Sequence, residues 1–340
     1  MEFGLFDHMD RGSGPDNELY KNRLEIIQTA EAAGFTGYHL AEHHMTPLGL
    51  APSPSVFLSV VAHATSTIRL GPLVYLLPMY HPLRLIEEIC MLDQMSNGRL
   101  DLGVGPGVSP YELGYYGVGE EKQAVYRETV DLLVKGLTSD TLTHHGDHHT
   151  FDDVPMILKT VQKPMPPMWA GVGSEDGMVF AAKHGINAIG LGPSGRIAQI
   201  VKFYRQAWDE QSKDPMRAFS PTKQPKVGAL RQIHIADTDE QAWAEAGPAY
   251  KHWFGSLNWL WEQHGDNASK FLLGDLQNGV DLGAVIVGSP DTVRKAMIKE
   301  RHMTGYNYAV LQFAFGTLSN AQVKHALALF EKEVMPALQG

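Results

Sequence analysis

The chain is organised around Gly37-Tyr38-His39-Leu40-Ala41-Glu42-His43-His44, a short apolar run that ends in one carboxylate and two imidazoles. The preceding residues, Ala32-Ala33-Gly34-Phe35, are typical of the end of a helix. The run therefore predicts a buried strand whose last residues emerge at the rim of a sheet or barrel. Reactive groups are expected at that rim.

A strand followed by a helix recurs along the whole chain. The predicted pairs lie at residues 1–6 and 18–33, 37–44 and 55–65, 68–76 and 81–95, 100–104 and 120–137, 167–172 and 176–183, 188–191 and 196–209, 227–236 and 239–261, and 308–313 and 321–334. Parallel strands need helical crossovers, so this order predicts an α/β protein, a (β/α)8 TIM barrel with loop insertions at its C-terminal face. An open doubly wound sheet is the alternative. The number of pairs and the lack of a linker favour a single TIM-barrel domain over residues 1–340.

Two stretches interrupt the repeat. Residues 139–166 are too long for a simple connection, and residues 141–151 within them predict a β-hairpin insertion that turns at Gly146-Asp147. Residues 265–288 show no strong period, and we interpret 265–284 as a candidate lid over the barrel mouth. An incidental surface loop is the alternative for this second stretch.

The composition narrows the class of protein. The 340 residues include 44% hydrophobic residues and carry a formal net charge of -10. Without a basic stripe, this charge argues against a nucleic-acid partner. The single cysteine, Cys90, excludes an internal disulfide and favours a reducing compartment, and its apolar neighbours indicate an ordinary core residue. No export signal and no membrane-spanning run is visible, so we expect a cytoplasmic protein with no membrane partner.

The C-terminal ends of barrel strands are where such enzymes place their reactive groups. The predicted ends hold Asp7 and His8; Glu42, His43 and His44; residues 75–81; residues 105–111; residues 173–177; Gly192; residues 231–234; and Phe315 with Gly316. This set is poor in carboxylates, which argues against a site with several acidic metal ligands.

Histidine-based metal sites are also disfavoured. His43 and His44 are adjacent, so on a strand they point to opposite faces, and one should face the barrel lumen. The histidines of the predicted hairpin, at 144, 145, 148 and 149, lie in a polar turn that indicates a solvated surface. No Gly-Xaa-Ser-Xaa-Gly elbow suggests Ser-His-Asp hydrolysis.

Two glycine-rich stretches suggest a flat, phosphorylated ligand. The first, Gly103-Val104-Gly105-Pro106-Gly107, lets a planar group approach the backbone, although a tight turn explains it equally well. The second, residues 171–177, places free N–H groups and the Ser174 hydroxyl where they could hold a phosphate. Ser174 as a simple helix N-cap is the compatible alternative.

Three phrases carry a family resemblance: Ala41-Glu42-His43-His44-Met45-Thr46-Pro47-Leu48-Gly49-Leu50, Leu77-Pro78-Met79-Tyr80-His81-Pro82-Leu83-Arg84 and Leu92-Asp93-Gln94-Met95-Ser96-Asn97-Gly98-Arg99. In this order they resemble the bacterial luciferase-like flavin-dependent monooxygenases. The resemblance implies a TIM barrel that uses O2 and reduced FMN from a separate flavin reductase. It also implies oxidation of a small, largely apolar substrate (an aldehyde, ketone or terpene-like compound) through a flavin C4a-hydroperoxide, and a homodimer formed through the second and third helices.

The resemblance also assigns roles to residues. It implies that His43 is catalytic, with Glu42 and His44 as orienting neighbours. It implies a cis peptide at Leu73-Val74 behind the flavin ring. The phosphate position maps to Ser174, with Gly173, Glu175 and Gly177 beside it, and Gly105 lies near the ring.

Two arginine positions of the family differ in this chain. Pro106 follows Gly105 where the family has an arginine after a reactive cysteine, and Ala124 occupies the second position, with Arg127 one turn away. Fewer guanidinium contacts predict a weaker hold on the phosphate. Two alternatives therefore stay open: an oxidoreductase that uses the deazaflavin F420, and a non-catalytic partner subunit like the second chain of luciferase.

Overall fold

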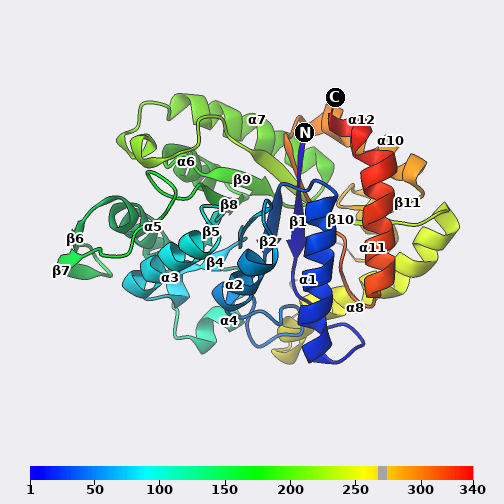
Figure 1. Ribbon diagram of the computed structural model, residues 1–340, viewed down its shortest axis with the longest axis horizontal. Coiled ribbons are helices and arrows are strands. Elements are labelled where there is room, and N and C mark those ends of the chain that lie inside the picture. Colours follow the sequence, from blue (N-terminus) through cyan, green and yellow to red (C-terminus); the bar gives the residue numbers. More distant parts are fainter. Residues whose placement is uncertain (267–273, 340) are drawn as a thin grey trace.

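Parallel strands form the centre of the molecule in the computed structural model, which describes residues 1–266 and 274–339, and helices surround them (Figure 1). The central strands are β1 (Glu2–Asp7), β2 (Gly37–Leu40), β3 (Arg69–Pro72), β4 (Tyr75–Leu76), β5 (Leu102–Gly105), β8 (Met168–Val172), β9 (Asn187–Gly190), β10 (Val227–Ile235) and β12 (Tyr308–Gln312). Their hydrogen-bonded order is β3-β2-β1-β12-β10-β9-β8-β5-β4. A parallel bridge from Leu70 to Leu100 joins the two ends of this order. The predicted TIM-barrel fold is therefore confirmed.

Helices cover the outside of the barrel. They are α1 (Asp16–Ala32), α2 (Pro54–Ala64), η1 (Leu77–Met79), α3 (Pro82–Met95), α5 (Lys122–Thr138), α6 (Glu175–Lys183), α7 (Ser194–Glu210), η2 (Pro215–Phe219), α10 (Pro290–Thr304), α11 (Asn320–Leu329), η4 (Phe330–Val334) and α12 (Pro336–Gln339). Their ends follow local chemistry. In α10, Ser289 caps the first turn, Pro290 takes the first helical position, and Gly305 ends the helix with a φ of 70°. Among the described residues, no helix has the length and apolar character needed to cross a membrane.

The seventh strand–helix pair differs from the prediction. The helix after β10, α8 (Asp239–Gln263), contributes Trp253 to a contact with His8 near the barrel mouth. A short strand that the sequence reading missed, β11 (Val285–Gly288), pairs with the last residues of β10. The helix that follows β11, α10, then packs beside α7, where Glu300 accepts a hydrogen bond from Ser194. A strand of four residues that leads directly into a helix cap leaves too short a pattern to recognise.

Both interrupting stretches have regular structure. Strands β6 (Thr141–His145) and β7 (Thr150–Pro155) pair as an antiparallel hairpin in the segment predicted as an insertion. The candidate lid, 265–284, lies partly outside the described residues, and its described part includes α9 (Leu276–Asp281). Lid function therefore stays a prediction.

The barrel lumen has its own small core, separate from the core beneath the helices. Alternation places Phe6, Ala41, Trp169, Ile189, Tyr308 and Val310 inside the barrel. At its lower end, His39 Nε2 lies 2.8 Å from the Tyr308 hydroxyl. A Cβ on Gly4 or Gly37 would fall 2.3 or 2.5 Å from that hydroxyl oxygen, so both glycines make room for the tyrosine.

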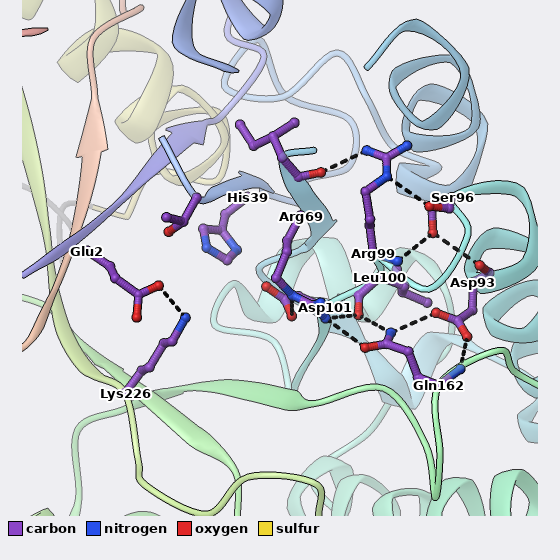
Figure 2. Close-up of polar contacts among 12 residues, drawn as sticks. Glu2, His39, Arg69, Asp93, Ser96, Arg99, Leu100, Asp101, Gln162 and Lys226 are labelled. Atoms are coloured by element: carbon purple, nitrogen blue, oxygen red, sulfur yellow. Dashed lines mark hydrogen bonds and ion pairs between the residues drawn. The ribbon is translucent and has the colours of Figure 1, made fainter. Parts of the chain in front are cut away.

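Ion pairs and hydrogen bonds close the N-terminal end of the barrel below this layer (Figure 2). Arg69 lies 2.8 Å from Asp101 and also donates to the side chain of Gln162. Lys226 pairs with Glu2 at 2.6 Å. The chain termini lie at this end too, because the Met1 amine donates to the Leu338 carbonyl oxygen (3.4 Å), whereas α4 (Pro110–Tyr115) and α8 lie at the opposite end (Figure 1).

Candidate active site

His43 lies at the C-terminal rim, three residues after β2, and is partly exposed. Its Nδ1 is 3.2 Å from Oε1 of Glu112, a buried carboxylate on α4. The same carboxylate accepts a hydrogen bond of 2.8 Å from the backbone N–H of His44. Glu112 therefore fixes the orientation of the His43 ring and of the backbone beside it.

Glu42 and His44 form a second, buried pair next to His43. His44 Nε2 is 2.8 Å from Glu42 Oε1, and the other Glu42 oxygen accepts from the backbone N–H of Leu76 at 3.0 Å. His44 Nδ1 lies 2.9 Å from the Tyr116 hydroxyl. The two histidine side chains thus have different partners, and Glu42 ties the end of β2 to β4.

His8 extends this polar rim toward β1. Its ring centroid is 5.6 Å from that of His43, and its Nδ1 accepts a hydrogen bond from the Trp253 indole N–H at 3.4 Å. Burial, reinforced by the nearby His43, lowers the pKa of His8 to about 3. His8 is therefore neutral near pH 7, and with Nδ1 as an acceptor its proton resides on Nε2.

A buried ion network supports the loop after β1. Arg23 pairs with Asp7 at 3.1 Å and with Asp10 at 3.2 Å. Burial raises the pKa of Asp10 to about 6, although Arg23 and the N–H of Gly316 oppose the rise. The network is structural support for His8 rather than part of an open site, since Asp7 and Asp10 are almost fully buried.

The residues predicted behind a flavin ring lie together at β4 and β5. The Leu73–Val74 peptide is cis, as the resemblance implies, and it separates β3 from β4. A Cβ on Gly105 would fall 2.5 Å from a methyl group of Val74. The backbone at Gly105 is therefore closely packed against the side chain of Val74, and the glycine is required there.

The predicted phosphate residues surround the N-terminus of α6. Ser174 is its N-cap and accepts from the N–H of Gly177 at 3.2 Å, so the plain capping role is present. Gly173, Ser174 and Glu175 are exposed. Because these residues are exposed, an anion could reach the backbone N–H groups at the start of α6. A bound phosphate would lie at the positive end of the helix dipole.

Two arginines flank this loop, although neither occupies a family position. Arg196, on α7, donates to the carbonyl oxygen of Gly173 at 3.3 Å. Arg127, on α5, forms an ion pair with Asp176 in the first turn of α6 and lies over the Phe180 ring at 5.2 Å. Positive charge therefore stands on both sides of the loop despite Pro106 and Ala124.

No metal site is present in the part of the chain that the structure describes, since it holds no cluster of three or more His, Cys, Asp or Glu side chains suited to a metal. The hairpin histidines instead contact Glu128, which accepts from His144 Nε2 at 3.1 Å and from two backbone N–H groups of the turn. His144, His148 and His149 thus help to hold the hairpin turn against Glu128.

Comparison with known proteins shows the family of the chain. The sequence matches the luciferase-like monooxygenase family over residues 1–308. The chain belongs to this family. Flavin-dependent monooxygenases are oxidoreductases, and this luciferase-like monooxygenase is therefore an enzyme of that class.

Three similar proteins place this luciferase-like monooxygenase more closely. The uncharacterized protein y4wF of Sinorhizobium fredii is 34% identical, over 98% of this chain and 96% of its own. The oxygenase component of the flavin-dependent trigonelline monooxygenase of Acinetobacter baylyi is 25% identical, over 99% and 95%. The oxygenating constituent of 3,6-diketocamphane monooxygenase from Pseudomonas putida, solved with FMN, superimposes with a TM-score of 0.78 at 22% identity, over 99% and 98%.

Sequence reasoning missed two of the functional side chains. Glu112 follows Ser109-Pro110-Tyr111, a pattern that predicts a capping box in which the glutamate would turn back to its own helix. Its carboxylate instead reaches across to His43 and His44. Arg196 begins a predicted helix, and only the pairing of β8 with β9 brings it to the phosphate loop.

Proposed function

We propose that this protein is the oxygenase component of a two-protein system. A separate flavin reductase supplies reduced FMN, and the protein uses O2 to add one oxygen atom to a small organic substrate, such as an aldehyde, a ketone or a terpene-like compound. The observation that carries the proposal is the His43–Glu112 pair at the barrel rim, just after β2, the strand that pairs with β3. Two similar proteins support it: the trigonelline enzyme is named an oxygenase component, and the 3,6-diketocamphane enzyme was solved in complex with FMN.

The chain's own residues supply the proton chemistry. His43 holds a proton near the reacting centre, and Glu112 keeps its Nδ1 occupied so that Nε2 faces the site. Glu42 and His44 fix the turn that carries His43, since Glu42 ties this turn to Leu76. Reduced FMN, when bound, supplies the electrons that activate O2.

The residues at the N-terminus of α6 fit the FMN phosphate. The Ser174 hydroxyl and the N–H group of Glu175 would bind its oxygens, with Gly177 beside them, and Arg196, together with Arg127 beyond its pair with Asp176, would balance its charge. Val74 and Gly105 would lie against the flavin ring.

Anaerobic equilibrium binding of reduced FMN and of reduced F420 tests the cofactor directly. We expect reduced FMN to bind and F420 not to bind. Oxygen uptake driven by NADH and a flavin reductase is then followed with a panel that contains a medium-chain aldehyde, a cyclic ketone and a monoterpene. Preferential binding of F420 would replace the proposal with hydride transfer. Turnover that survives His43→Ala would remove the catalytic assignment of His43.

We also propose that two copies of the chain associate through α2 and α3. These helices pack against each other, and they expose Val56 (68%), Val60 (48%), Met91 (53%) and Met95 (52%) to solvent. The two residues on each helix are four positions apart, so each helix exposes one apolar pair to solvent. Light scattering should give the mass of two chains for the wild type and of one chain for Val60→Asp/Met91→Asp. A monomeric wild type would contradict the proposal.

A further inference from the structure

The upper part of the barrel lumen is polar, whereas the part below it is apolar. Alternation along β10 and β12 turns Gln232 and Gln312 to the same side as Leu230 and Val310, which belong to the lumen core. Gln232 and Gln312 are register partners on neighbouring strands. His8 follows β1, the strand on the other side of β12, and its ring lies 4.8 Å from that of Phe6.

The two glutamines have hydrogen-bonding capacity that the protein leaves unused. Gln232 is 5% exposed and Gln312 is 0% exposed. Gln312 Nε2 donates to the Ala314 carbonyl at 3.3 Å, which fixes the amide orientation. Gln232 Nε2 and Gln312 Oε1 are buried and have no well-formed hydrogen bond within the described residues, although the Gln312 side chain lies beside the ring of His8. A buried donor or acceptor without a hydrogen bond lowers the stability of the folded protein, and a ligand that bonds to both groups would remove this penalty.

Gln232, Gln312 and His8 carry no formal charge themselves. His8 is neutral near pH 7 because burial and His43 lower its pKa to about 3, and Gln312 beside it opposes only part of this change. The nearest arginine on β10, Arg231, points to the outer side of the strand and pairs with Glu300 there. Gln232, Gln312 and His8 themselves therefore offer no counter-ion to an anionic or cationic substrate group.

The polar surface and the proposed flavin contacts lie on different halves of the barrel. His43, His8, Gln312 and Gln232 come from β2, β1, β12 and β10, which are consecutive in the sheet. The proposed flavin contacts come from the β3–β4 connection, β5 and the β8 loop, which lie on the other side. A substrate resting on the polar half would face the flavin, with His43 at the border.

We propose that Gln232, Gln312 and His8 form a hydrogen-bonding floor that recognises a neutral substrate group with a carbonyl next to an N–H, as in an amide or a lactam. Gln232 Nε2 would donate to the carbonyl oxygen, and Gln312 Oε1, which has a second lone pair beside its contact with His8, would accept the N–H. This inference rests on the proposed function, because it assigns the substrate class of the same barrel mouth. It makes the substrate more polar than a hydrocarbon, aldehyde or terpene.

Ligand-observed NMR titration tests this floor without turnover, on the protein with and without FMN. The probes are 2-quinolinone (a lactam), naphthalene (a hydrocarbon of the same shape) and 2-naphthoate (a carboxylate). We expect 2-quinolinone to bind at least about tenfold more tightly than either other probe. Gln232→Leu and Gln312→Leu should each reduce this preference about tenfold. Gln28→Leu, an exposed change on α1, is the matched control and should leave it unchanged.

Three outcomes would overturn the inference: equal affinity for naphthalene, tighter binding of 2-naphthoate, or an unchanged lactam preference in both leucine variants. Thermal unfolding of each variant checks that the variant is folded. If a glutamine variant is not folded, His8→Leu provides a second test of the same floor. Flavin binding is measured separately. Lactam preference without FMN binding would refute the proposed function alone, and FMN binding without lactam preference would refute this inference alone.

Discussion

The proton handling that we propose for His43 would depend on Glu112, a residue whose neighbours in sequence suggest only a helix cap. The carboxylate holds His43 from one side and the backbone of His44 from the other. Because it acts through His43, Glu112 is a positioning residue. Its effect on turnover should therefore be separable from any effect on flavin binding.

Changing Glu112 to Gln should lower turnover by about 10- to 100-fold, because a neutral amide holds the His43 ring less strongly than the carboxylate does. The affinity for reduced FMN should change by less than about twofold. Turnover against pH should shift in the variant, which a purely structural role would not produce. Glu121→Gln, an exposed change near α5, is the control. Equal losses in turnover and FMN affinity would contradict this role.

The phosphate loop allows a second test at a single residue. Replacing Arg196 with Met removes one guanidinium beside Gly173 and should weaken reduced FMN binding about tenfold, since a charged contact to the phosphate is lost. Fluorescence or absorbance titration under anaerobic conditions measures this. Arg84→Met, at an exposed position on α3, should bind FMN like the wild type. Unchanged affinity in Arg196→Met would place the phosphate elsewhere.

His39, deep in the lumen, should make the protein less stable in acid. Burial lowers the pKa of His39 to about 4, from about 6.5 in the unfolded chain. The contribution of neutral His39 to the unfolding free energy is fully present above about pH 6.5. It is lost as the pH falls toward 4, because the unfolded chain binds the proton more readily than the folded protein does. Between pH 7 and 4.5 we expect His39 to cost on the order of 2 kcal/mol of unfolding free energy. Urea unfolding should show that the unfolding free energy of His39→Gln falls less between pH 7 and 4.5 than that of the wild type. The same pH dependence in both proteins would contradict the prediction.

At the level of helices and strands, α10 takes the position beside α7 that the sequence reading gave to the helix after β10. The buried pair of Arg231 and Glu300 joins β10 to α10, with Nε and Oε1 2.7 Å apart. Replacing either partner alone leaves an uncompensated buried charge. Each of Arg231→Met and Glu300→Leu should therefore lower the unfolding free energy by about 3 kcal/mol.

The double variant provides the matched comparison for this pair. Because it removes both charges, Arg231→Met/Glu300→Leu should lose clearly less stability than the sum of the single changes. Chemical denaturation at constant pH measures all four members of the cycle. Additive losses would mean that the pair does not join these elements energetically.

Most of the elements could be predicted because strand and helix periodicity is local. The split of residues 68–76 into β3 and β4 could not, since it follows from the geometry at Leu73–Val74, which periodicity does not encode. β11 was missed because Val285-Ile286-Val287-Gly288 is a short run that pairs only with the extended end of β10. For the same reason, α8 was mistaken for a ring helix.

Across the whole molecule, the barrel was predictable but the composition of its mouth was only partly so. His43, Glu42, His44 and the Ser174 loop follow strands and can be found by listing strand ends. Glu112 and Arg196 lie on helices that only the closed barrel brings to the rim. The polar floor of Gln232 and Gln312 depends on strand register, which the sequence does not encode locally.

Met1 and Leu338 lie close together, which suggests that the barrel could form from a circularly permuted chain. A short peptide could link the two ends, and a new start could be cut in the turn at residues 146–149, between β6 and β7 and outside the barrel sheet. Such a circular permutant should fold and bind reduced FMN with the affinity of the parent chain. Circular dichroism and flavin titration would check this, and a permutant that folds but cannot bind flavin would tie the site to the hairpin.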